Sequence, residues 1–233
     1  MPARGIMARD LRLPHTKAGP ISLSALTTAF RQHRADAIMS FMVLIWGFHF
    51  IVAKDALSNI EPLTFNALRF LVGLPVILPV ALRQRRALRL TRRDAALVTL
   101  LTLTGPVIYQ VGFSLGLKRT TTTNTALLVA TIPTWTALCS IAIGMVEIRR
   151  RLLAGIVLTL SGVLLVVLSR AESGLGLSHS ELVGSTLVLG AAIASGLANV
   201  FAKPVVDRLG SMPLAIWKYW ITTVMMIVLA GPG

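Results

Sequence analysis

Arg69 carries the sharpest chemistry in the sequence, because it lies inside the apolar stretch 63–82 and not at its end. In a helix it would lie roughly 9 Å from the nearer edge of the stretch. A guanidinium facing lipid there costs of order a few kcal/mol, so Arg69 is expected to face protein or a wet cavity. Asn66 lies one helical turn earlier, on the same face. Guanidinium pairs well with planar anions, which predicts a contact with a substrate carboxylate. Snorkelling to the outer interface or capping of a helix end is the alternative.

Other polar side chains also lie within apolar stretches. His49 has Trp46 one helical turn earlier, and its imidazole could carry a coupling proton because it titrates near neutral pH. Packing or direct contact with a substrate is the preferred interpretation of His49. The remaining polar groups could line a central site or form hydrogen bonds between helices, each worth about 1 kcal/mol. The predicted substrate-binding set is Arg69, Asn66, His49, Trp46, Tyr109, Gln110, Asn124 and Asn199.

Several other kinds of site lack the residues that they need. No Asp or Glu lies deep in an apolar stretch, which argues against an acidic proton relay or a sodium cage. The sequence has no phosphate-binding loop of the G-x-x-x-x-G-K-[ST] type and no His, Cys and Glu cluster at metal-ligand spacing. Thr120–Thr123 are expected to cap a helix start and not to act as nucleophiles. We therefore predict no catalytic residue, cofactor or metal, and no enzyme activity.

Long apolar blocks must position these residues. The chain of 233 residues is 55% hydrophobic, with a mean hydropathy of +0.76, which is too apolar for an ordinary soluble domain. Blocks of about 20 residues are long enough to cross hydrocarbon as helices. Pro133 and the pair Gly105–Pro106 are expected to bend the two spans that contain them. We predict seven spans, at 37–56, 63–82, 95–116, 123–145, 152–169, 183–202 and 212–230.

The net charge of +14 follows these spans and does not indicate a nucleic-acid partner. Lys and Arg gather at one set of span ends, in 1–36, in RQRRALRLTRR (83–93), at 149–151, and at Lys203, Arg208 and Lys218. The opposite ends hold only Lys54, Lys118, Arg119 and Arg170. The positive-inside rule makes the N-terminus cytoplasmic. Anionic membrane lipids are the expected partners of the basic loops.

Two stretches of the sequence resemble each other, GFHFIVAK at 47–54 and GLANVFAK at 196–203. Gly, Ala and Lys recur at the same offsets, and a Pro-Leu pair follows each stretch. The second copy begins an odd number of predicted spans after the first, so it enters the membrane from the opposite side. This predicts an inverted-topology repeat, which many secondary transporters use to form two related gates. Lys54 and Lys203 are expected to snorkel to opposite interfaces.

Longer stretches resemble a known family. IWGFHFIVAK and EPLTFNALRFLVG resemble the first two helices of EamA-type permeases of the drug/metabolite transporter superfamily. TTTTNTALLVATIPTWTALCSIAIGMVEIRRRLLAGIVLTLSGVLLVVL resembles the fourth and fifth helices, and ASGLANVFAK the start of the second repeat. The family has ten spans in two repeats of five. Here the resemblance implies a first repeat of five spans and a second of two. The inner loop from Glu147 is one residue shorter than usual. His49 lies where Asn or another small polar residue is usual.

The resemblance implies an all-α polytopic transmembrane helix bundle of about seven helices, an inverted five-helix repeat whose second repeat is incomplete. Its parts would be a basic cytoplasmic segment at 1–36, a first EamA-like repeat at 37–169 and a partial second repeat at 183–233. We expect a permease, apparently truncated, in the bacterial cytoplasmic (inner) membrane. It would transport small metabolites such as amino acids or related carboxylates by alternating access, outward as an exporter.

A second hypothesis is a non-transporting, truncated permease or a helical partner in a membrane complex, with a homodimer or a missing-helix partner supplying the rest. A third class, seven-helix receptors and retinal proteins, does not fit. Receptors of that kind place the N-terminus outside, against the distribution of Lys and Arg. A retinal carrier needs a lysine deep in the last span and an acidic counterion in the third. Lys218 lies near the inner end of its span, and 95–116 has no Asp or Glu.

Overall fold

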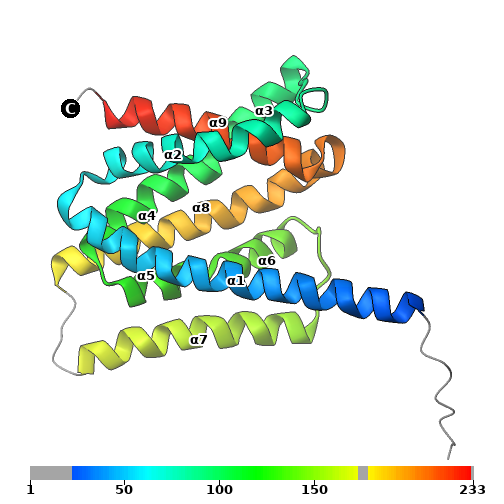
Figure 1. Ribbon diagram of the computed structural model, residues 1–233. Helices are drawn as coiled ribbons and strands as arrows, with labels where there is room; N and C mark the ends of the chain where they lie inside the picture. Colours follow the sequence, from blue (N-terminus) through cyan, green and yellow to red (C-terminus); the bar gives the residue numbers. More distant parts are fainter. Residues whose placement is uncertain (1–22, 173–177, 232–233) are drawn as a thin grey trace, which may run out of the picture. The chain divides into compact units, whose positions relative to one another are not determined.

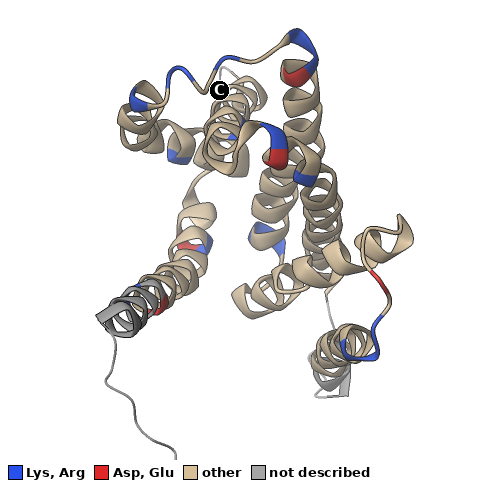
Figure 2. Ribbon diagram, turned by 90° about the vertical axis from the view of Figure 1, so that its right-hand side faces the viewer, with Lys and Arg blue, Asp and Glu red and all other residues tan. Residues whose placement is uncertain are grey.

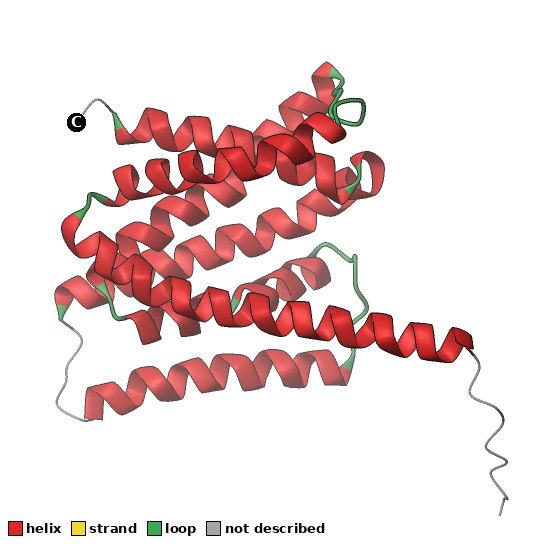
Figure 3. Cartoon of the chain, viewed as in Figure 1, coloured by secondary structure: helices red, strands yellow, loops and turns green. Residues whose placement is uncertain are grey.

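The computed structural model describes residues 23–172 and 178–231, with side chains for 34, 36–166 and 178–231. This part of the chain consists of helices joined by short connections, and it contains no strand (Figures 1 and 3). One short element, η1, is a π-helix. The elements are α1 (Leu23–Asn59), α2 (Pro62–Arg83), α3 (Arg92–Thr102), η1 (Leu103–Val107), α4 (Ile108–Arg119), α5 (Thr122–Val129), α6 (Ile132–Ala142), α7 (Arg150–Glu172), α8 (His179–Leu209) and α9 (Ser211–Ala230).

Two compact units make up the chain, residues 1–47 and residues 48–233. The first contains the N-terminal part of α1, and the basic segment predicted at 1–36 lies largely outside the described residues. The second contains the end of α1, from Phe48, and all later helices. Every contact described below is internal to this second unit.

Long apolar helices confirm the predicted polytopic bundle. Among the described residues, six segments are long and apolar enough to cross a membrane, Asp36–Asn59, Pro62–Arg83, Arg92–Arg119, Thr122–Ala142, His179–Leu209 and Ser211–Ala230. Each overlaps a predicted span, and α8 runs about two turns beyond the predicted end at residue 202. The span predicted at 152–169 falls in α7, whose side chains beyond Val166 lie outside the described residues.

The surfaces of these helices are those of a protein in lipid. Figure 2 shows Lys and Arg mainly at helix ends and in connections. Between the ends, large apolar side chains point outward: Val72 and Val76 on α2 are each 76% exposed, and Leu158 on α7 is 75% exposed. Exposing such area to water costs about 25 cal/mol per Å², whereas lipid chains cover it without that cost. The chain is an integral membrane protein.

Two spans are interrupted near the predicted prolines. Proline has no N–H, so it leaves a carbonyl unbonded one turn earlier in a helix. At Pro106 the third span widens into η1. In the fourth span α5 ends at Val129, and α6, with Pro133 in its first turn, begins at Ile132. The predicted helix start is also confirmed, because Thr121 caps α5, its Oγ1 accepting from the N–H of Asn124 at 3.2 Å.

Small residues allow α4 and α8 to approach closely. A Cβ added at Gly116 would lie 2.5 Å from Cγ2 of Val188 and 2.7 Å from the carbonyl oxygen of Gly184. A Cβ at Gly112 would lie 2.9 Å from Cβ of Ala191. Small residues at such crossings are the common device for packing helices in membranes. They fix the position of α4, which carries Gln110.

Helix α2 is held against α9 by a hydrogen bond to its backbone. The hydroxyl of Tyr219 on α9 donates to the carbonyl oxygen of Phe70 on α2 at 2.7 Å. The two rings also lie 5.2 Å apart between centroids. This contact fixes the turn of α2 that carries Arg69.

Candidate functional site

Arg69 joins three helices at its guanidinium. The side chain is half-buried on α2. Its Nη1 lies 3.0 Å from Nε2 of His49 on α1, and its Nη2 donates to Oε1 of Gln110 on α4 at 2.7 Å. A guanidinium has only N–H donors, so Nε2 of His49 accepts and the ring carries its proton on Nδ1. Both partners are side chains, so Arg69 neither caps a helix end nor extends to the membrane interface.

Aromatic rings surround this polar contact. The guanidinium carbon of Arg69 lies 5.9 Å from the ring centroid of Phe65 and 5.3 Å from that of Phe70. The ring of His49 stacks on Phe113, with centroids 6.2 Å apart and planes at 13°. Tyr109 stacks on the same ring at 5.7 Å. Aromatic faces attract a cation and exclude water. The guanidinium of Arg69 therefore has His49 and Gln110 as polar partners and aromatic rings around them.

The positive charge of Arg69 is not neutralised by a carboxylate. Within the described residues, the ion pairs are Arg149 with Glu147 and Arg208 with Asp94, and no acid lies within 4.0 Å of Arg69. Neutral His49 and Gln110 satisfy hydrogen bonds without cancelling the charge. A half-buried cation within a membrane span normally pairs with an anion or marks a substrate path. The uncancelled positive charge of Arg69 would therefore favour binding of an anionic ligand.

Asn66 adds a second unsatisfied group one helical turn from Arg69. It is fully buried, and its Nδ2 donates to the carbonyl oxygen of Gln110 at 3.1 Å and to Oγ of Ser114 at 2.7 Å. A carbonyl only accepts, so the amide orientation is fixed and Oδ1 is the atom that remains without a partner among the described residues. A buried acceptor without a donor costs about 1–3 kcal/mol. A ligand N–H or a water would satisfy it.

The predicted site residues divide into those that cluster with Arg69 and those that do not. His49 and Gln110 contact Arg69 directly. Asn66 is linked to it through Gln110, and Tyr109 through Phe113 and His49. Trp46 belongs to the first unit, and the cluster is described without it.

The other two predicted residues lie apart from the cluster. Asn124 donates to Oγ1 of Thr120 at 3.3 Å and lines a cavity of about 320 Å³ between α5, α6, α7 and α8, which does not include Arg69. Leu127 and Thr131, on either side of the break in span four, line the same cavity. Asn199 is exposed on α8 and has no hydrogen bond to any described residue.

Lys54 has a role that the sequence did not predict. Instead of snorkelling, its Nζ donates to the carbonyl oxygens of Leu117 at 2.6 Å, Lys118 at 3.1 Å and Thr120 at 2.7 Å. These are the unbonded carbonyls at the C-terminal end of α4, where a cation is favoured by the helix dipole. Lys203, its counterpart in the repeat, is exposed and has no such contact with described residues. No spacing in the sequence pairs Lys54 with α4.

We expect Lys54→Met to destabilise the folded protein by about 1–2 kcal/mol, because three carbonyls lose a charged donor at a partly solvated site. Thermal unfolding of the purified chain in detergent measures this. Lys203→Met removes the same charge from the corresponding position and should leave the midpoint unchanged. Equal effects of the two substitutions would refute the capping role.

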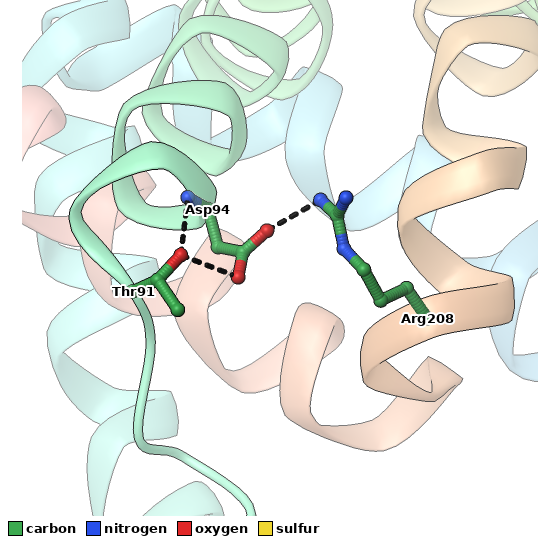
Figure 4. Close-up of polar contacts among 3 residues, drawn as sticks. All are labelled: Thr91, Asp94 and Arg208. Carbon is green, nitrogen blue, oxygen red and sulfur yellow. Dashed lines mark hydrogen bonds and ion pairs between the residues drawn. The ribbon is translucent and has the colours of Figure 1, made fainter.

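A second polar contact joins α3 to the end of α8 (Figure 4). Oγ1 of Thr91 accepts from the N–H of Asp94 at 3.2 Å and donates to Oδ2 of Asp94 at 2.7 Å, which caps α3. The other carboxylate oxygen of Asp94 pairs with the guanidinium of Arg208. Asp94 is 8% exposed, so this end of the bundle is held by a largely buried carboxylate. The contact also places 83–93 and Arg208 at one end of the spans, as the positive-inside distribution requires.

Asp94→Ala is expected to cost about 1–2 kcal/mol of folding stability, because it removes the hydrogen bond that Thr91 donates to the carboxylate and the half-exposed ion pair with Arg208. The cap bond from the backbone N–H of residue 94 to Thr91 is retained. Asp207→Ala, one residue from Arg208 but without a partner among the described residues, serves as the matched control. The difference between the two unfolding midpoints is the measurement. No difference would mean that the ion pair and the side-chain hydrogen bond from Thr91 contribute nothing.

Comparison with known proteins places this arrangement in a family. A model of the EamA-like transporter family matches residues 33–168, more than half of the chain. The chain is 29% identical over 204 residues to a protein of Escherichia coli (strain K12) described as a probable amino-acid metabolite efflux pump, covering 84% of this chain and 63% of that protein. It is 25% identical over 187 residues to the uncharacterized transporter YoaV of Bacillus subtilis (strain 168), covering 80% and 63%.

A third relative, an uncharacterized transporter of Archaeoglobus fulgidus, is 29% identical over 134 residues, which cover 58% of this chain and 46% of the relative. The chain thus spans less than two-thirds of the length of these curated relatives. No solved structure matches it significantly. The family match covers the helices that carry His49, Arg69 and Gln110. The chain belongs to the EamA-like transporter family.

Proposed function

We propose that this transporter moves small metabolites with a carboxylate, such as amino acids, and that Arg69 binds the carboxylate. The observation that carries the proposal is the guanidinium of Arg69, held half-buried between α1, α2 and α4 without an acidic partner among the described residues. The names of two relatives, probable amino-acid metabolite efflux pumps, support the substrate class and the outward direction.

The geometry suggests how a zwitterion would be held. The substrate carboxylate takes the place of His49 and Gln110 on the two Nη atoms of Arg69, where a planar fork matches two carboxylate oxygens. The substrate ammonium donates to Oδ1 of Asn66, the buried acceptor that has no partner. His49, released from Arg69, is then free to take up a proton. Binding of the carboxylate to Arg69 and protonation of Nε2 of His49 both break the same contact, so each favours the other, which is one way to couple their movements.

Alternating access would arise from the inverted repeat. The first repeat, 37–169, supplies the Arg69 cluster, and the partial repeat, 183–233, contains the second Gly-to-Lys stretch. The interruptions at η1 and between α5 and α6 supply points at which spans three and four can change direction. Bacterial relatives and the distribution of Lys and Arg favour the bacterial inner membrane, with a cytoplasmic N-terminus.

The experiment compares the metabolites released by cells that make the chain, cells that make Arg69→Ala at a matched membrane level, and cells with neither. We expect selective release of one amino acid or related carboxylate by the first cells only. Release that survives in Arg69→Ala would remove Arg69 from the site. No release above the empty cells, with the chain correctly inserted, would contradict transport by this chain.

A further inference from the structure

An apolar groove lies along α3, η1 and α8, outside the Arg69 cluster. It has a volume of about 640 Å³. Its walls include Leu100, Leu197 and Phe201, which are 57%, 41% and 50% exposed. Its floor includes Thr104 of η1, where the third span is interrupted. Such open apolar surface in a membrane protein must be covered by lipid or by protein.

Both walls of the groove end in an arginine. On α8 the lining runs from Ala194 through Leu197 and Phe201 to Arg208, in steps of three and four residues. On α3 the lining begins at Leu97, and Arg93 lies one turn earlier on the same face. The ion pair between Asp94 and Arg208 brings these two helix ends together (Figure 4). The two arginines therefore lie at the same end of the groove.

The charge at this end is positive. Five basic residues lie on the ends of α3 and α8 or just before them, and two acidic residues accompany them. The basic residues are Arg89, Arg92, Arg93, Lys203 and Arg208, and the acidic residues are Asp94 and Asp207. Arg93 is exposed and has no partner among the described residues, and Arg208 is half exposed beside its ion pair. An anionic group would find unused N–H donors there.

The length of the groove also fits a lipid. From Ala194 to Arg208 the wall of α8 rises by roughly 21 Å at 1.5 Å per residue. One leaflet of hydrocarbon is about half of the 30 Å core, and a headgroup adds several ångströms. We propose that this groove binds one anionic phospholipid, whose phosphate contacts Arg93 and Arg208 and whose acyl chain lies along α3 and α8. The site is independent of the substrate site, and it goes beyond the general attraction of basic loops to anionic membranes.

The test is a lipid titration of the purified full chain in detergent, followed by native mass spectrometry. Phosphatidylglycerol and phosphatidylcholine with identical acyl chains are the two probes. We expect phosphatidylglycerol to bind more tightly, and Arg93→Gln to lower its affinity about five-fold, the value of one arginine at an anionic headgroup. Lys118→Gln, which removes one exposed charge from the opposite end of the same span, should change neither lipid's affinity.

A second variant tests the apolar part of the groove. Ala194→Phe fills the groove at its far end, so both lipids should bind less tightly while the melting temperature without lipid stays within error. Equal binding of the two lipids by the unaltered chain, or equal losses in Arg93→Gln and Lys118→Gln, would overturn the proposal. So would a disulfide-linked dimer of Leu197→Cys in a Cys139→Ser background in membranes, because a second copy would then occupy the groove.

Discussion

Arg69→Gln is expected to lower selective transport roughly ten- to hundred-fold, because a net loss of one charged hydrogen bond to the proposed substrate carboxylate is worth about 1.5–3 kcal/mol. Glutamine keeps a polar side chain with a good helix propensity, so insertion and folding should persist. Arg69→Lys keeps the charge but not the planar fork, and an intermediate loss is expected. Rates of release per inserted molecule are the measurement.

Arg83→Gln is the matched control for this prediction. It removes one arginine from the same helix, at the exposed end of α2. Transport by Arg83→Gln should equal that of the unaltered chain. A similar decrease in Arg69→Gln and Arg83→Gln would show that transport depends on overall charge and not on a contact at Arg69.

Stability separates a binding role of Arg69 from a structural one. A charge that lacks an ionic partner in a membrane span destabilises the empty protein. Arg69→Met should therefore melt at the same temperature as the unaltered chain or a higher one, in the absence of substrate. Arg69→Met also removes the donor that serves His49 and Gln110. A variant that melts at a lower temperature would show that these two bonds stabilise the empty protein more than the unpaired charge destabilises it, which is a structural role.

Gly116→Ala is expected to have the largest effect on folding. The single added Cβ would meet Val188 and the backbone oxygen of Gly184 at 2.5 and 2.7 Å, so α4 and α8 must separate. Backbone cannot move aside as a side-chain end can, which places the cost at the upper part of the 1–3 kcal/mol range for overpacking, about 3 kcal/mol. Denaturant unfolding in detergent measures the loss.

Gly190→Ala makes the same change in α8 where a Cβ would meet nothing within 4 Å. There the gain in helix propensity should stabilise the chain by roughly 0.5–1 kcal/mol. The two substitutions are thus expected to have opposite signs. A loss of stability in both would mean that the α4–α8 crossing is not set by small residues.

The spans and their interruptions could be predicted from the sequence, because both depend on local properties. A block of about 20 apolar residues is long enough for one crossing wherever its neighbours lie. Pro106 and Pro133 were expected to bend their spans, and each lies in or beside an interruption. Pro75, Pro79 and Pro204 lack an N–H as well but lie inside continuous helices, so a proline alone does not predict an interruption. Arg69 and Asn66 were correctly placed on one helical face by their spacing alone.

The partners of polar residues could not be predicted, because they depend on how each helix is rotated against its neighbours. Asn124 and Asn199 were expected at the same site as Arg69, yet one lines a separate cavity and the other is exposed. Lys54 was expected at the membrane interface and instead caps α4, more than 60 residues later in the chain. Ser114, which accepts a hydrogen bond from Nδ2 of Asn66, carries no signal in the sequence at all.

The most direct test of the central claim is equilibrium binding of a labelled amino acid to the purified full chain in lipid nanodiscs, in competition with two unlabelled analogues. One analogue lacks the carboxylate and the other has it converted to an amide. Binding by a carboxylate contact at Arg69 predicts that the amino acid displaces the label, that neither analogue does, and that Arg69→Met binds none of the three. Displacement by the decarboxylated amine, or unchanged binding by Arg69→Met, would contradict it.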